Sequence, residues 1–447
     1  MRSSPGRYII SHLAAFFFAA LATLSCAVAD DDKAAKKSQY ASALTRKRQA
    51  VGRLCAVKLE AAQEVIAAQQ WSRAEQVLNA AAGKHCTTSF EKSQVWNYLG
   101  YVYFSRQNYQ QALATYLKLI DEPEVERKMK VSTFNTVAQL YFQREDYTNA
   151  AGFLERWMEA LTVDGQTGDP PTKALLAQAY YQLGRKQASL RYVGEAINDY
   201  QAKGKLPPES WWSLQSLLYF EQQQYRLALP VLKQLITHYP RYRYWHQLGG
   251  LYGELGEDME RLVATEIIYL AGALKKEREL VSLAYLYLGA NTPYQAAKIL
   301  DTAINNGSIG SAGGHLELLG LAWQQAGEGK RARPVLEKAA TLSGQGNIYA
   351  QLASVYLDIG DSASAVAAAL NAIDKGELKK PGFLQLVLGN AQLNLHCYDH
   401  AAKAFEQAGK YRAVATKARQ WADYTQVEEE RVKDLRAAGA DLPACSA

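Results

Sequence analysis

The chain has 447 residues, of which 48% are hydrophobic and 21% charged, and its formal net charge is +6 at pH 7. This composition excludes bulk disorder and predicts a packed protein, and a content of only 12 prolines favours helices. The net charge is too small to indicate a nucleic-acid-binding protein.

Residues 1–29 are typical of a secretory signal peptide. Two arginines supply a positive start, residues 8–24 are mainly apolar, and residues 27–29 form an Ala-Val-Ala cleavage site. We therefore expect cleavage after Ala29 and an exported mature protein.

Two alternatives to cleavage stay open. The first is an uncleaved membrane anchor, although residues 8–24 are interrupted by polar side chains and are shorter than a typical span. The second is lipidation of Cys26, although the residues before it fit such a site poorly. No later segment is apolar enough to span a bilayer.

Residues 30–52 are predicted to form a polar, basic lead into the first helix. Their basic side chains include Lys33, Lys36, Lys37, Arg46, Lys47 and Arg48. We favour a solvated tail, and the alternative is that these side chains contact membrane phospholipid.

Residues 53–410 contain one pattern that recurs about every 34 to 39 residues. In its clearest copy, Trp96 precedes the pair Leu99 and Gly100, and Ala112 and Tyr116 follow in a second helix. This pattern resembles the tetratricopeptide repeat (TPR), a hairpin of two helices named A and B. The resemblance implies an all-α TPR superhelical solenoid of about ten helical hairpins.

The residue types of the pattern have a physical reason. Helices A and B cross closely, so their contact points need Gly or Ala while large residues fill the remaining space. A single hairpin cannot bury its own apolar face, and stacking on the next hairpin buries it and curves the array. In the copy that begins near residue 241, we expect Trp245 to be the large core residue.

Residues 411–437 are charged and rich in alanine, and they predict a C-terminal capping helix. Terminal repeats need an outer face that tolerates solvent, which such a helix provides. Residues 438–447 would form the C-terminal tail.

Loss of Cys26 with the signal leaves an even number of cysteines, which in an exported chain suggests disulfides. Cys55 and Cys86 lie at the open end of the first hairpin. Cys397 lies in the turn of the last repeat, and the capping helix returns the tail with Cys445 to the same end. We predict the pairs Cys55 with Cys86 and Cys397 with Cys445, and buried unpaired thiols are the alternative.

No catalytic or metal-binding pattern stands out in the sequence. His396, Cys397 and His400 are close together but lack a second ligand pair, so we favour a surface turn over a zinc site. The glycine-rich residues 306–314 and 327–330 are predicted to be a linker and a turn rather than a phosphate loop. We therefore expect a non-enzymatic protein with no cofactor, metal or small-molecule substrate.

Residues 241–246 hold the strongest concentration of basic and aromatic side chains. An ordinary helix start is the favoured interpretation. The alternative is that the side chains other than Trp245 stack on or pair with an acidic or carboxylate-bearing ligand.

In TPR proteins the binding groove is lined mainly by helix A. Carried over position by position, the resemblance implies partner-binding roles for Asn97, Tyr101, Phe104, Asn135, Gln139, Phe142, Gln178, Tyr181, Phe220, Arg243 and His246. These amide and aromatic groups suit an extended peptide. The Lys and Arg clamp with which some members bind a C-terminal carboxylate is not reproduced.

Residues 92–109, 244–257 and 280–300 resemble an exported TPR component of TonB energy-transduction systems in Gram-negative bacteria. This resemblance implies a periplasmic adaptor that contacts TonB, ExbB or ExbD and does not itself carry the proton or the iron. The alternative is a TPR adaptor in outer-membrane or cell-wall assembly.

Overall fold

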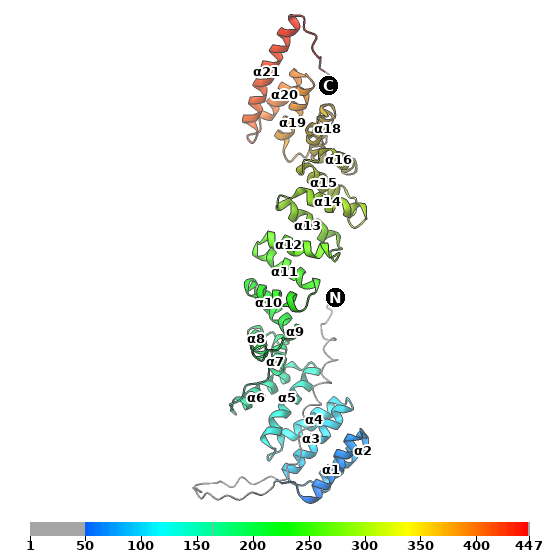
Figure 1. Cartoon of the computed structure of the whole chain (residues 1–447), viewed down its shortest axis with the longest axis vertical. Coiled ribbons are helices and arrows are strands. Elements are labelled where there is room, and N and C mark those ends of the chain that lie inside the picture. The colour runs from blue at the N-terminus through cyan, green and yellow to red at the C-terminus, as the bar shows by residue number, and fades with distance from the viewer. Residues whose placement is uncertain (1–49, 164, 446–447) are drawn as a thin grey trace. The chain divides into compact units, whose positions relative to one another are not determined.

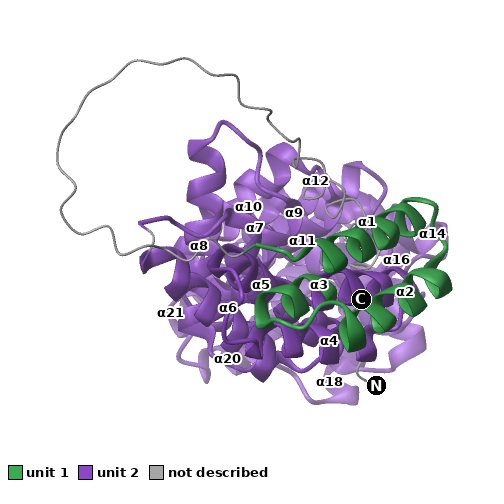
Figure 2. Cartoon of the chain, turned by 90° about the horizontal axis from the view of Figure 1, so that it is seen from below, with its two compact units in different colours: residues 1–95 green, residues 96–447 purple. Residues whose placement is uncertain are grey.

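A computed structural model describes residues 50–163 and 165–445 of the chain. The predicted signal at residues 1–29, the possible lipidation site at Cys26 and nearly all of the predicted lead lie outside these residues. The described residues form 21 helices and no strand (Figure 1). The chain divides into two compact units, residues 1–95 and residues 96–447 (Figure 2).

Unit 1 contains α1 (Arg53–Ala67), α2 (Trp71–Lys84) and the first residues of α3 (Ser89–Ser105). The helices α1 and α2 pack together, and small or apolar side chains on each are buried, namely Cys55, Leu59 and Ala62 with Ala74, Leu78 and Ala81. The predicted disulfide between Cys55 and Cys86 is present. It closes the open end of this hairpin.

The carboxylate of Glu91 holds the ends of unit 1 together. It accepts hydrogen bonds from the backbone N–H groups of Gly52 at 2.8 Å, Thr87 at 2.9 Å and Thr88 at 3.0 Å. Burial acts to raise the pKa of Glu91, but the backbone donors outweigh it and the pKa is lowered. The start of α1 is thereby tied to the start of α3.

Unit 2 contains the remainder of α3 and all later helices, which pack as consecutive pairs joined by short turns (Figure 1). Their bounds are α4 (Tyr109–Asp121), α5 (Arg127–Gln143), α6 (Tyr147–Val163), α7 (Pro170–Gln182), α8 (Lys186–Ala202), α9 (Glu209–Glu221), α10 (Tyr225–His238), α11 (Tyr242–Leu255), α12 (Asp258–Leu270), α13 (Glu277–Gly289), α14 (Pro293–Asn305), α15 (Gly313–Gln325), α16 (Gly329–Ser343), α17 (Gly346–Asp358), α18 (Ser362–Lys375), α19 (Pro381–Asn394), α20 (Tyr398–Gly409) and α21 (Ala415–Ala437).

Helix starts in unit 2 follow from proline and from short polar side chains. Pro170, Pro293 and Pro381 occupy the first positions of α7, α14 and α19, where a missing N–H costs no hydrogen bond. Asn108 and Asp361 cap α4 and α18 by accepting from a backbone N–H three residues ahead.

The predicted close crossing of helices A and B is present in the structure. A Cβ atom added at Gly320 would lie 2.5 Å from the Leu336 side chain, and one at Gly389 would lie 2.6 Å from the Phe405 ring. No side chain fits there, so glycine sets the distance between the two helices.

The two glycine-rich segments have the predicted structural roles over most of their length. Residues 306–312 connect α14 to α15, and the turn before α16 contains Gly327 with φ at 75°. The last two residues of each segment are instead helical, because α15 begins at Gly313 and α16 at Gly329. The equivalent turn after α3 places Gln107 at φ 61°, a left-handed conformation that side chains rarely adopt.

Trp245 packs against the core as predicted, although it is half-buried. Tyr244 beside it is fully buried, because α11 turns the Tyr244 ring toward α9. One predicted element bound needs correction. The capping helix α21 begins at Ala415, after a turn that includes Tyr411, rather than at residue 411. The predicted disulfide between Cys397 and Cys445 is present at this end.

No helix in the described part of the chain is long and apolar enough to cross a membrane.

Candidate functional site

The residues predicted to bind a partner recur at matching places on the A helices of unit 2. Within a helix they are three or four residues apart and therefore share one side, which we call the helix-A face. They are Asn97, Tyr101 and Phe104 on α3, Asn135, Gln139 and Phe142 on α5, Gln178 and Tyr181 on α7, Phe220 on α9, and Arg243 and His246 on α11. All of them are half-buried or exposed. The prediction that they bind a partner stays open.

An aromatic side chain near the end of the A helix is braced by the next helix. The ring centroids of Phe142 and Tyr147 are 5.2 Å apart at an edge-on angle of 76°. Phe104 contacts Tyr109 in the same way, and Phe220 contacts Tyr225 at 5.5 Å. Because each ring is held by a neighbour, it needs little ordering before it receives a ligand.

The amides on α5 form a chain of hydrogen bonds that reaches α7. Gln139 Nε2 donates to Asn135 Oδ1 at 3.1 Å, and Asn135 Nδ2 donates to Thr172 Oγ1 at 3.1 Å. Asp169 in turn caps α7 by accepting from the backbone and hydroxyl of Thr172. Asn135 therefore joins two repeats and orients Gln139.

Tyr181 makes a second link between repeats. Its hydroxyl donates to Glu221 Oε1 at 3.1 Å, while Lys186 Nζ lies 2.8 Å from Glu221 Oε2. Burial and the Glu221 carboxylate raise the pKa of Tyr181, so the hydroxyl stays protonated and neutral. The Glu221 carboxylate and the Lys186 ammonium therefore neutralise each other.

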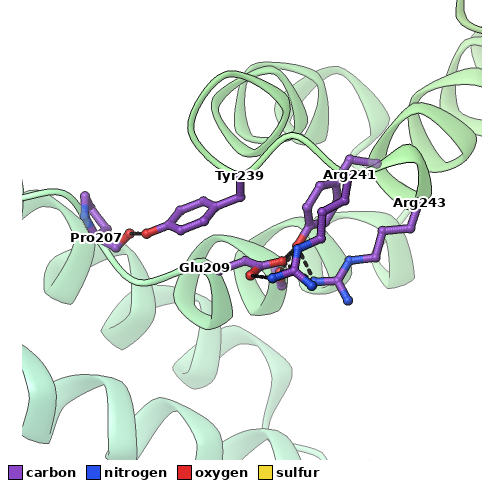
Figure 3. Close-up of polar contacts among 7 residues, drawn as sticks. Pro207, Glu209, Tyr239, Arg241 and Arg243 are labelled. Atoms are coloured by element: carbon purple, nitrogen blue, oxygen red, sulfur yellow. Dashed lines mark hydrogen bonds and ion pairs between the residues drawn. The ribbon is translucent and has the colours of Figure 1, made fainter. Parts of the chain in front are cut away.

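The basic cluster at residues 241–246 finds its carboxylate within the chain. Glu209, the first residue of α9, accepts from Arg243 and from the Tyr244 hydroxyl, and Arg241 lies 3.0 Å from its second oxygen (Figure 3). Tyr239 donates to the backbone carbonyl of Pro207 at 2.9 Å beside this group. The segment forms the start of α11, as the favoured interpretation expected, and Glu209 pairs with both arginines within the chain. The alternative that the cluster binds an external carboxylate stays open.

A groove at the C-terminal end was not predicted. Its volume is about 1220 Å³. It lies between the A helix α19, the first residues of α18 and α20, and α21, and its lining includes Asn390, Asn394, Tyr398, Trp421 and Tyr424. Asn390 and Asn394 repeat the helix-A positions that Gln139 and Gln143 hold on α5, so the pattern contained a signal for them.

The α21 wall of this groove had no such signal, because α21 does not continue the repeat. Trp421 stacks on Phe405 with centroids 6.1 Å apart, and Tyr424 contacts Trp421 edge-on at 5.8 Å. Trp421 remains 39% exposed and Tyr424 50% exposed. The groove therefore presents two supported aromatic rings opposite the α19 amides.

Comparison with known proteins agrees with the helical pattern. Residues 59–124 match the family model of the tetratricopeptide repeat. The described residues form an all-helical array of hairpins, and residues 59–124 match this repeat. A search of curated proteins found no match.

Several solved structures are similar to parts of this chain. A crystal structure of MamA is 21% identical, with a TM-score of 0.33 over 39% of this chain and 94% of that one. The APC/C hetero-tetramer Cut9-Hcn1 is 13% identical, with a TM-score of 0.32 over 83% of each chain. YrrB, described as a TPR protein with an unusual peptide-binding site, is 13% identical, with a TM-score of 0.34 over 42% of this chain and 87% of that one.

Proposed function

We propose that this protein is a non-enzymatic scaffold that binds an extended peptide of a protein partner on its helix-A face. One observation carries the proposal. An aromatic ring recurs near the end of four successive A helices, at Phe104, Phe142, Tyr181 and Phe220, with amides one turn earlier on α5 and α7. TPR solenoids are typically scaffolds for protein interactions, which supports this class of function.

The chemistry of the face indicates the kind of peptide. An extended peptide offers backbone N–H and C=O groups, which the amides of Gln139 and Gln178 match, and alternate side chains, which can pack on the rings. Two of the carboxylates beside this face are paired within the chain, Glu221 with Lys186 and Glu209 with Arg243. We therefore expect apolar and uncharged side chains in the bound segment.

The groove between α19 and α21 offers the same chemistry at the other end of unit 2. Asn394 Nδ2 donates to Ser362 Oγ at 3.2 Å, and Asn390 Nδ2 donates to the Leu386 carbonyl at 2.7 Å. Both side-chain carbonyl oxygens are left as acceptors for a peptide N–H. This groove would hold a second stretch of a partner.

A crosslinking experiment tests the helix-A face. A photoreactive amino acid is placed at Phe142 or Phe220 in the cells that express the protein, and the partner is crosslinked by illumination. The crosslinked segment of the partner is then identified and synthesised as a peptide. Its affinity for the purified protein should fall about tenfold or more in the variant with both Phe142→Ala and Phe220→Ala.

Leu342→Ala is the matched control, because Leu342 is 58% exposed but lies on the B helix α16. It should leave the affinity unchanged. Equal crosslinking from position 342, or an unchanged affinity of the double variant with normal helicity, would contradict the assignment.

The system that the scaffold serves is proposed from the sequence resemblance. Residues 92–109, 244–257 and 280–300 support a periplasmic accessory role in a TonB-dependent transport system, and the signal at residues 1–29 supports export. Cell fractionation tests the location. Recovery of TonB, ExbB or ExbD among the crosslinked partners tests the system, whereas recovery of outer-membrane or cell-wall assembly factors would favour the alternative adaptor.

A further inference from the structure

The first turn of α20 brings together three side chains that can bind a soft metal ion. Cys397 Sγ, Cys445 Sγ and a ring nitrogen of His400 all lie within 4.8 Å of one another. The sequence favoured a surface turn here because His396, Cys397 and His400 lacked a second ligand pair. The C-terminal tail supplies the missing cysteine.

Two of these ligands are fixed by the helix itself. Cys397 is the N-cap residue of α20 and is buried, and His400 follows three residues later in the first turn, on the same side of the helix. His396, in the preceding turn, has a ring nitrogen 3.3 Å from the Tyr398 hydroxyl and is not part of the group.

The third ligand is held close by more than the disulfide. Arg436, in the last turn of α21, donates to the backbone carbonyl of Pro443 at 2.7 Å. This contact folds the tail back two residues before Cys445. Opening the disulfide therefore leaves Cys445 near Cys397.

We infer that reduction of the disulfide between Cys397 and Cys445 creates a zinc site from these two cysteines and His400. A dithiol transfers two electrons and two protons to the S–S bond, which breaks to give two thiols, and the dithiol itself becomes a disulfide. Zn²⁺ then displaces both thiol protons to form two Zn–S bonds, and the His400 imidazole donates its nitrogen lone pair.

The charge and the geometry of the site suit this ion. Two thiolates neutralise Zn²⁺, so little net charge is placed beside the buried Cys397, and the positive N-terminal end of α20 favours a thiolate there. Two sulfurs and one nitrogen are ligands that zinc prefers in a tetrahedral site, and a water completes the fourth position. This inference does not depend on the proposed peptide-binding function.

Metal titration of the mature protein tests the site. The protein is reduced with dithiothreitol, freed of it by anaerobic gel filtration, and titrated with Co²⁺ and with Zn²⁺ against a chromophoric chelator. Reduced protein should bind one Zn²⁺ per chain at this site, and the Co²⁺ form should show thiolate-to-metal charge-transfer absorption. Non-reduced protein should show neither.

Variants separate this site from the other disulfide and from general histidine binding. His400→Ala and Cys445→Ser should each weaken Zn²⁺ binding at least tenfold, while His396→Ala and the double variant Cys55→Ser with Cys86→Ser should retain it. Circular dichroism confirms that each variant is folded. Absence of Zn²⁺ binding to the reduced protein would overturn the inference. So would a Zn²⁺ affinity of His400→Ala and Cys445→Ser equal to that of the natural protein.

Discussion

The hydroxyl of Tyr287 lies 2.6 Å from Oε1 of Glu266 and joins α13 to the B helix of the preceding repeat. The same contact recurs between Tyr180 and Glu155 at 2.5 Å and between Tyr356 and Glu337 at 2.6 Å. Each tyrosine occupies the eleventh position of its repeat, where the ring fills the core. Its hydroxyl thus adds a directional bond to the apolar contact between repeats.

Removal of one such hydroxyl should weaken one interface between repeats. Tyr287→Phe loses a hydrogen bond to a carboxylate and leaves Glu266 without it, so we expect destabilisation of about 1.5–3 kcal/mol. Hydrogen exchange of α12 and α13 measures the effect locally. Tyr285→Phe is the control, because Tyr285 is 58% exposed and its change should be negligible. Equal protection in both variants would contradict the role of the bond.

The same bonds predict a loss of stability at high pH. Burial, together with the Glu337 carboxylate, raises the pKa of Tyr356 from 10.0 to about 12. The folded state therefore keeps a proton that the unfolded chain releases, and the contribution is complete below pH 10 and lost as pH rises toward 12. Thermal unfolding from pH 9 to pH 12 should show a shallower decline for Tyr356→Phe than for the natural protein. Parallel curves would exclude this contribution.

The carboxylate of Glu91 predicts that the stability of unit 1 falls at acid pH. The pKa of Glu91 is lowered in the folded state, so its contribution is present above the pKa of the unfolded chain and is lost as pH falls through the folded pKa. Glu91→Gln should destabilise unit 1 at neutral pH by about 1–3 kcal/mol. It should also reduce the loss of unit 1 stability as pH falls, which is the acid limb of the stability curve. Hydrogen exchange of α1 and α2 reports on this unit. An unchanged acid limb would refute the assignment.

Two glycines on A helices should respond to alanine in opposite directions. Gly320→Ala places a methyl group against Leu336 and should cost about 1–3 kcal/mol, because α15 and α16 cannot move apart without loss of packing. Gly250 has no neighbouring atom within 4 Å of an added Cβ, so Gly250→Ala should stabilise α11 by up to about 1 kcal/mol. Denaturant unfolding compares the two. Stabilisation by both substitutions would show that the crossing distance is not fixed at Gly320.

Periodicity explains why most of the fold was predictable. The large, small and large residues at Trp96, Gly100 and Tyr116 have counterparts of the same size class in later repeats, because every hairpin packs its two helices in the same way. One pattern therefore predicts helices, turns and close crossings. The first cysteine pair followed from the hairpin, because an antiparallel pair of helices brings Cys55 near Cys86, and the second followed from the predicted return of the capping helix. Phe104, Phe142 and Phe220 could be placed on the helix-A face for the same reason.

The sequence by itself determined the all-helical repeat fold, because hydrophobic period and small-residue spacing are local properties of the chain. The tertiary structure alone decided which polar groups meet: Glu209 pairs with Arg241 and Arg243, and Asn135 bonds to Thr172. The more complete burial of Tyr244 than of Trp245 is likewise a tertiary outcome. It also decided that α21 closes a groove with α19 and that the tail brings Cys445 to His400. These contacts depend on helix rotation and on the path of a non-repeating end, which no repeat pattern encodes.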